Sequence, residues 1–183
     1  MTAVADFVLA AMISLAPGRD HTTNADAIAR AVEAAPPLFA ADESRLRTAA
    51  LVTAIAFRES SFRNDVTSKT HDSCMMQVNR RPDLATDPEA CVRVAIGMLR
   101  ESMRMCPAFP VAFYASGPGA CTNVRAQRIS RDRMALAARL VRDVAAAEVV
   151  KPAPTGLRTP IDAAPRLWDL DPRDLRTLRA VAT

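Results

Sequence analysis

Apolar residues recur every three or four positions along most of this chain, a spacing that places them on one face of an α-helix. Prolines and N-capping residues mark the expected helix ends. Helices are predicted over 3–15, from Thr23 or Asn24 to Pro36, from Asp42 or Ser44 to Glu59, from Asp87 to about Met105, over 109–115, and after a cap at Ser130. We therefore expect a mostly α-helical fold.

Two stretches depart from this pattern. Residues 63–73 are polar and predict a loop, and the apolar run 74–78 predicts a short strand or the floor of that loop. After Lys151 the composition changes, and five of the thirteen prolines lie between Pro152 and Pro172. The predicted organisation is a helical extension over 1–41 that packs on the domain, a domain over 42–148, and a proline-rich tail over 149–183, whose segments 167–168 and 175–181 could dock elsewhere.

Charge narrows the class of partner. The chain has 183 residues and a net charge of +4, spread along the sequence without a basic arm. This distribution favours acidic partners such as cell-wall polymers or anionic membranes over nucleic acid, so no nucleic-acid partner is expected. A solvated helix face is predicted for Arg125, Arg128, Arg131, Arg133 and Arg139.

No stretch reaches the roughly 20 apolar residues of a transmembrane helix, so no transmembrane segment is expected. The N-terminal residues carry Asp6 and lack a positively charged start, which makes a poor signal peptide and favours an amphipathic packing helix. If the protein works in an oxidising compartment, it would be exported by a phage particle, as a holin-dependent lysin or through a secretion apparatus.

Four cysteines, Cys74, Cys91, Cys106 and Cys121, predict two disulfides. Cys91 and Cys106 flank one predicted helix and would lie about 22 Å apart, too far for a bond. Sequence proximity favours Cys74–Cys91 with Cys106–Cys121, and Cys74–Cys106 with Cys91–Cys121 is the alternative. A zinc site using His71 is disfavoured because no C-x-x-C pair is present, so neither a metal nor another cofactor is expected.

Glu59 is the candidate for acid catalysis. Cleavage of a glycosidic bond requires a carboxylic acid that keeps its proton near neutral pH. Burial beside Phe57 and Phe62 and the negative end of a helix would both raise the pKa of Glu59. The neighbouring Arg58 would lower that pKa, but successive helical residues point about 100° apart, so Arg58 can face away.

Four sequence blocks, in order, carry a family resemblance. Glu59-Ser60-Ser61-Phe62 looks like the E-S-x-F signature of soluble lytic transglycosylases and goose-type lysozymes. Cys74-Met75-Met76-Gln77 resembles their G-L-M-Q block. Asp87-Pro88-Glu89, then Cys91 to Leu99, is similar to their D-P-E-x-N-I-x-x-G-x-x-x-L helix. Phe113-Tyr114-Ala115-Ser116-Gly117 resembles A-Y-N-S-G. The resemblance extends loosely from Asp42 to Ala145 and is greatest to phage-encoded and secretion-system-associated members.

The resemblance implies a lysozyme-like, mostly α-helical domain with two lobes and a small β or loop segment near residues 63–79. It implies cleavage of the MurNAc–GlcNAc β-1,4 bond of peptidoglycan in the periplasm or cell wall, with Glu59 acting first as acid and then as base. It also implies substrate-binding roles for Ser60, Met76, Gln77 and Tyr114, with Ser60 hydrogen-bonding near Glu59 and Tyr114 orienting Glu59 or the sugar. The partners would be glycan strands and, through the terminal segments, virion or secretion-apparatus proteins.

Two departures from the family pattern bear on substrate binding. Cys74 replaces the glycine of G-L-M-Q, and Ala115 replaces the asparagine of A-Y-N-S-G. These departures and the proline-rich tail motivate one alternative, a catalytically weakened, lysozyme-like structural or wall-binding component of a virion or secretion apparatus. A helical DNA-associated protein is a third and less favoured alternative. Asp65 and Asp72 could serve as second carboxylates for ordinary hydrolysis, but both are expected to be solvated loop residues.

Overall fold

The computed structural model describes the backbone of residues 2–40 and 44–150, with side chains described through Val144. The elements are α1 (Ala3–Leu15), α2 (Thr22–Ala34), α3 (Ser44–Ser60), β1 (Asp72–Ser73), β2 (Val78–Asn79), the short 3-10 helix η1 (Pro82–Thr86), α4 (Pro88–Met105), α5 (Ala112–Ser116) and α6 (Val124–Val150). The predictions of a mostly helical fold and of a small β segment near residues 63–79 are confirmed. The predicted tail falls almost wholly outside the described residues.

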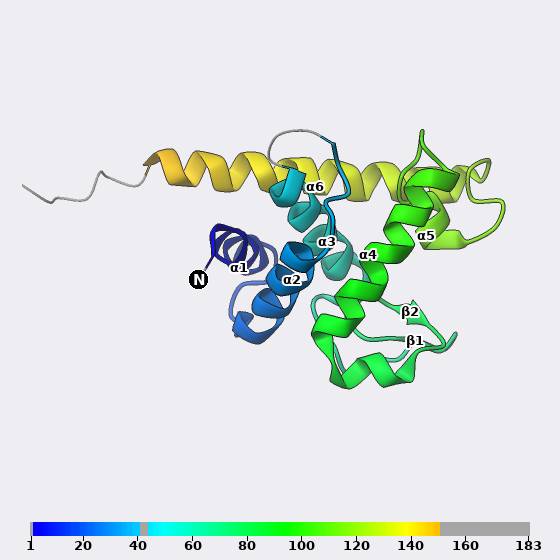
Figure 1. Cartoon of the computed structure of the whole chain (residues 1–183), viewed down its shortest axis with the longest axis horizontal. Helices are drawn as coiled ribbons and strands as arrows, with labels where there is room; N and C mark the ends of the chain where they lie inside the picture. The colour runs from blue at the N-terminus through cyan, green and yellow to red at the C-terminus, as the bar shows by residue number, and fades with distance from the viewer. Residues whose placement is uncertain (1, 41–43, 151–183) are drawn as a thin grey trace, which may run out of the picture. The chain divides into compact units, whose positions relative to one another are not determined.

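The central helix is α3. Every residue from Ala49 to Ala56 is fully buried, and a helix that is buried on all sides is typical of the middle of a core. The helices α1 and α2 pack on α3, and α2 also packs on α4. Figure 1 shows α6 running along one side of this bundle, with α5 beside its N-terminal end. The N-terminal helices therefore share one hydrophobic core with the rest of the fold.

Several predicted element ends are wrong by a few residues. The long helix α6 begins at Val124, because Asn123 caps it by accepting a hydrogen bond from the backbone N–H of Ala126 at 3.1 Å. Ser130 lies inside this helix, buried, and its hydroxyl accepts from the N–H of Val111 at 3.0 Å. The helix α2 begins at Thr22 rather than after Thr23 or Asn24, and α5 begins at Ala112 rather than at residue 109.

The β segment is a two-stranded antiparallel ladder. Asp72 pairs with Asn79 and Ser73 with Val78, and residues 74–77 form the turn between the strands. The prediction of a strand over 74–78 is therefore wrong. The alternative, that this run forms the floor of the loop, is right, because Cys74, Met75 and Met76 are fully buried. The sheet packs on η1 and α4.

Two disulfides join the segments around α4, and the favoured pairing is confirmed. Cys74 bonds to Cys91, which ties the turn between the strands to the first part of α4. Cys106 bonds to Cys121, which ties the end of α4 to the loop before α6. No helix in the described part of the chain is long and apolar enough to cross a membrane.

Candidate active site

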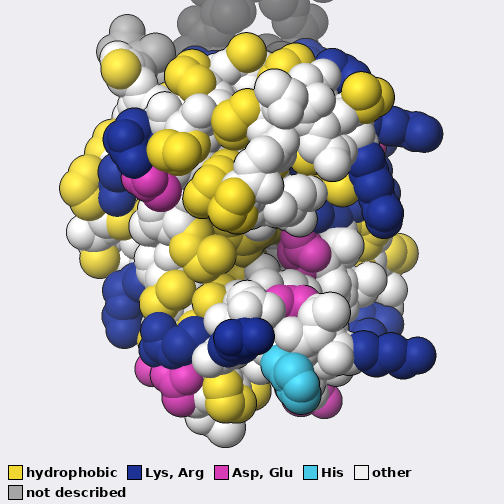
Figure 2. Space-filling model, turned by 90° about the vertical axis from the view of Figure 1, so that its right-hand side faces the viewer, with side chains coloured by type: hydrophobic (Ala, Val, Ile, Leu, Met, Phe, Trp, Pro, Cys, Tyr) yellow, Lys and Arg dark blue, Asp and Glu magenta, His cyan; other side chains and the backbone are white. Residues whose placement is uncertain are grey.

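Glu59 lies in the last turn of α3 and lines a cleft of about 620 Å³. The cleft is lined by residues of α3, the β segment, α4 and α5: Glu59, Asp72, Gln77, Asn79, Met98, Glu101, Phe113, Tyr114, Ala115, Ser116, Gly117 and Pro118. Figure 2 shows the side of the molecule that carries α5 and the strands, where acidic side chains lie in a hollow beside an apolar band. The side chain of Glu59 is only 20% exposed.

This partial burial determines the protonation of Glu59. Loss of solvent raises the pKa of the Glu59 carboxyl above its usual value and is the largest influence on it, while the negative charge of Asp72 adds to the rise. The positive charge of Arg133 acts in the opposite direction but does not cancel the effect of burial. A carboxyl group in such surroundings can hold a proton and donate it to a bound molecule.

The chain turns sharply after Glu59. Ser61 and Phe62 have φ angles of 53° and 65°, a left-handed conformation that residues other than glycine rarely adopt. The guanidinium of Arg19 donates to the carbonyl of Ser61 at 3.2 Å, and the side-chain amide of Asn24 donates to the carbonyl of Phe62 at 2.7 Å. The helix α2 and the loop before it therefore hold the turn that ends the helix of Glu59.

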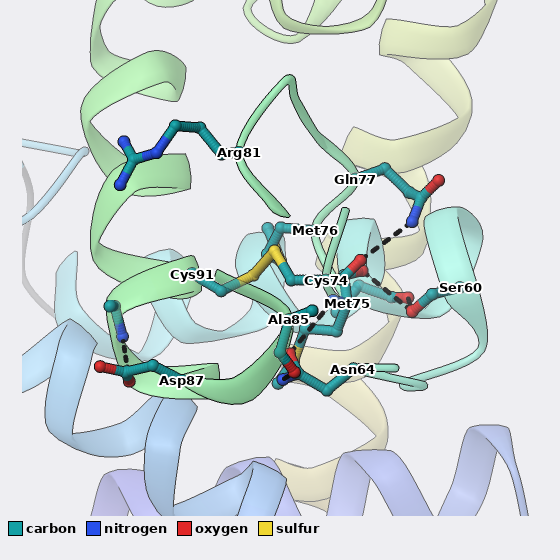
Figure 3. Close-up of a disulfide and its surroundings, with 12 residues drawn as sticks. Ser60, Asn64, Cys74, Met75, Met76, Gln77, Arg81, Ala85, Asp87 and Cys91 are labelled. Carbon is teal, nitrogen blue, oxygen red and sulfur yellow. Dashed lines mark hydrogen bonds between the residues drawn. A yellow bond between two sulfur atoms is a disulfide. The ribbon is translucent and has the colours of Figure 1, made fainter. Parts of the chain in front are cut away.

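Ser60 and Met76 do not line the cleft, contrary to the substrate-binding roles predicted for them. Ser60 is buried, and its hydroxyl donates to the carbonyl of Met75 at 2.9 Å, joining the end of α3 to the loop (Figure 3). The side chain of Met76 is fully buried in the core. Both residues connect the loop to its surroundings instead of facing the cleft.

Gln77 and Tyr114 do line the cleft, as their predicted roles require. The side-chain amide of Gln77 donates to the carbonyl of Cys74 at 3.0 Å (Figure 3). The hydroxyl of Tyr114 donates to the carbonyl of Met76 at 2.5 Å, and burial, followed by the charge of Glu59, raises the pKa of this hydroxyl. Tyr114 therefore stays neutral and connects α5 to the loop across the cleft.

The replacement of glycine by Cys74 has a structural explanation. Cys74 has a φ of 63°, in the left-handed region where glycine is normally preferred and another residue costs about 1–2 kcal/mol. The Cys74–Cys91 disulfide fixes this residue against α4 (Figure 3). The covalent bond can thus hold a turn that glycine would otherwise adopt freely.

Asp72 lines the cleft together with Glu59 and Glu101, whereas Asp65 is exposed and lies outside it. The prediction that Asp72 is simply solvated is wrong. Burial alone would raise the pKa of Asp72, but its hydrogen bonds to Thr70, Asn79 and Ser68 outweigh that effect and lower the pKa. Asp72 is therefore a stable anion beside a carboxyl group that tends to keep its proton.

Arg133 is a component of the site that the sequence interpretation missed. Its Nη2 lies 2.5 Å from Oε1 of Glu59, and its side chain is only 9% exposed. The prediction that Arg133 belongs to a solvated face is wrong, whereas Arg58 does face away and pairs with Asp132. The spacing of residues along α6 could have predicted that Arg133 is buried. Position 133 belongs to a stripe of buried residues three or four positions apart, which includes Ala126, Ser130, Arg133, Ala137 and Leu140.

Among the described residues, no three histidine, cysteine or acidic side chains converge on a point that could hold an ion. The side chains of the cleft include a proton-holding carboxyl, two carboxylates, two amides and a neutral phenol, placed around a space large enough for sugar rings.

Comparison with known proteins agrees with this arrangement. Residues 37–136 match the family model described as the transglycosylase SLT domain, and the match includes Glu59, the β segment, α4 and α5. Neither the curated proteins nor the solved structures compared with the chain give a match. The helical fold is consistent with the lysozyme-like domain of that family, and the chain belongs to the transglycosylase SLT domain family.

Proposed function

We propose that this chain cleaves the β-1,4 bond between N-acetylmuramic acid and N-acetylglucosamine in peptidoglycan, with Glu59 as acid and then base. The observation that carries the proposal is the position of Glu59, whose carboxyl has a raised pKa and lines the cleft within a domain of the lytic transglycosylase type. Family membership supports the reaction class and its peptidoglycan substrate, and the cleft supports the assignment of the acid.

The proposed reaction has two steps. The protonated Glu59 donates its proton to the bridging oxygen as the bond from that oxygen to C1 of the muramic acid breaks. The Glu59 carboxylate then removes a proton from the nucleophile that attacks C1. If the nucleophile is the 6-hydroxyl of the same sugar, a 1,6-anhydro ring forms; if it is water, a reducing end forms. Asp72, an anion in the same cleft, is placed to stabilise positive charge at C1 in either case.

Incubation of the protein with purified sacculi tests this proposal. We expect soluble muropeptides to be released, and mass spectrometry of these products distinguishes the two outcomes because the anhydro product is lighter than the reducing product by one water. The absence of released muropeptides under all conditions of pH and salt would contradict the proposed activity.

Arg133→Gln should move the alkaline limb of the pH–rate profile to higher pH. The charge of Arg133 lowers the pKa of Glu59, so its removal raises that pKa further and keeps the catalytic proton in place to higher pH. Arg133→Lys retains a positive charge and should leave the limb closer to that of the wild type. Rates measured across pH, with circular dichroism to confirm folding, check this expectation. A limb that moves to lower pH in Arg133→Gln would refute it.

Asp72→Asn should move the same limb to lower pH. The negative charge of Asp72 helps to raise the pKa of Glu59, so its removal lowers that pKa and the proton is lost sooner as pH rises. Asp65→Asn is the matched control, because Asp65 is exposed and lies outside the cleft. If both substitutions give the same pH profile, Asp72 does not influence Glu59 as the structure indicates.

A second candidate function is wall binding without cleavage. The ion pair between Arg133 and Glu59 favours it, because a carboxylate held by a cation is a weaker acid catalyst. In that case the wild type and Glu59→Gln would both bind sacculi and neither would release muropeptides.

We also propose that cleavage serves local opening of the wall by a phage or a secretion machine. Support comes from the two disulfides, which are typical of proteins that work in oxidising compartments, and from the likeness of the four sequence blocks to such members. Detection of the chain in purified virions or in an isolated secretion apparatus would test this context.

A further inference from the structure

A second hollow, of about 440 Å³, lies beside the end of α3 and along α6. It is lined by Arg58, Arg125, Arg128, Ile129, Asp132 and Arg133, and we call it the arginine pocket. Positions 125, 128 and 132 are three or four residues apart, so α6 presents them on one side. Four arginines against one aspartate make the pocket a region of positive charge.

The positive charge of the pocket is only partly neutralised. Arg58 pairs with Asp132 at 2.9 Å, but both side chains are about half exposed, so this pair is weak. Arg125 and Arg128 are exposed and form no ion pair with another described residue. Two guanidinium groups are therefore free to bind an anion that enters from solvent.

Arg133 links the arginine pocket to the cleft. It lines the pocket, while its Nη2 contacts Glu59, which lines the cleft. Its Nη1 is buried and has no hydrogen-bond partner among the described residues. Buried donors are nearly always paired in folded proteins, so this nitrogen remains a donor for a further acceptor.

We propose that the arginine pocket binds a carboxylate of the peptide stem carried by the glycan strand, an inference that rests on the proposed function. Muramic acid bears this stem, and stem peptides carry free carboxylates. Guanidinium groups bind carboxylates through paired, charge-assisted hydrogen bonds. Arg133 lines the pocket and contacts Glu59, so the pocket lies close to the cleft in which a strand would be cleaved. The cluster is compact, unlike the extended basic surface that tracks a nucleic-acid backbone.

Two substrates test the proposal: glycan strands with intact stems, and the same strands after an amidase has removed the stems. We expect the wild type to have a higher kcat/KM on the strands with stems. We define the stem preference as kcat/KM on strands with stems divided by kcat/KM on strands without them. Arg125→Gln/Arg128→Gln should reduce this ratio about tenfold, which is the effect of losing one charge-assisted hydrogen bond. The double variant Arg139→Gln/Arg142→Gln, which removes the same charge from the same helix outside the pocket, should retain the ratio. An equal ratio in the wild type and Arg125→Gln/Arg128→Gln would overturn the proposal.

Direct binding separates this inference from the proposed function. A synthetic stem peptide with free carboxylates should bind the wild type in a calorimetric titration, and its fully amidated form should not. Binding of the free peptide should be lost in Arg125→Gln/Arg128→Gln. If the peptide binds the wild type but not the double variant, and no strand is cleaved, the proposed activity is refuted and the pocket assignment remains intact. If inorganic phosphate binds but the free peptide does not, the pocket recognises a phosphate source and the stem assignment is wrong.

Discussion

Glu59→Gln should lower the rate of muropeptide release from purified sacculi by about 10²–10⁴-fold, the usual contribution of a general acid–base group. Glutamine has nearly the same shape as glutamate but cannot donate an acidic proton or accept one as a carboxylate does. Binding of sacculi should survive, because the cleft keeps its other lining residues. The assay is the initial rate of muropeptide release, measured together with sacculus binding.

Glu101→Gln is the matched control, because Glu101 belongs to the same cleft and the substitution is the same. The hydrogen bonds from Arg104 lower the pKa of Glu101, so this residue is ionised at neutral pH and cannot supply the proton. Its substitution should therefore cost far less than that of Glu59. Similar losses in both variants would show that cleft charge in general, and not the proton of Glu59, determines the rate.

Removal of the Cys74–Cys91 disulfide should lower the stability of the fold substantially. Cys74→Ala/Cys91→Ala opens a loop with a sequence separation of 17 residues, which lowers the free energy of unfolding by about 3 kcal/mol. For a chain of this size, each kcal/mol lowers the melting temperature by about 2–4 °C, so a decrease of about 6–12 °C is expected. Thermal unfolding followed by circular dichroism measures it.

This variant should also lose activity well below its melting temperature. The disulfide holds the turn that carries Gln77 and the carbonyl that accepts from Tyr114. Cys106→Ala/Cys121→Ala is the comparison, because its separation of 15 residues predicts a similar loss of stability at a site away from the β segment. If the two variants lose activity to the same extent at low temperature, the first disulfide has no particular role in the cleft.

Local signals in the sequence were enough to predict most of α3, α4 and the position of Glu59. Asp87 caps α4 by accepting from the N–H of Ala90, as its sequence Asp-Pro-Glu indicates. Cysteine spacing was enough to favour the correct disulfides, because one pairing would have had to span a whole helix and sequence proximity favoured one of the other two. These features depend on residues that are close together in the chain.

Features that depend on distant residues could not be predicted in this way. Arg133 is 74 positions away from Glu59, and only the packing of α6 against α3 brings the two together. Ser60 and Met76 belong to the predicted site blocks, yet the fold turns the first toward a loop carbonyl and the second into the core. A motif identifies residues near a site, whereas the direction of each side chain is decided by its neighbours in space.

The turn after Glu59 has a consequence for the smallest working unit of this protein. The family match begins at residue 37, yet Arg19 and Asn24 hold the carbonyls of Ser61 and Phe62. A fragment trimmed to the matched region would keep Glu59, the proposed catalytic residue, while losing two hydrogen bonds that fix the end of its helix. The segment that matches the family model is therefore shorter than the segment needed to hold the site. Residues before position 37 contribute to the structure of the site.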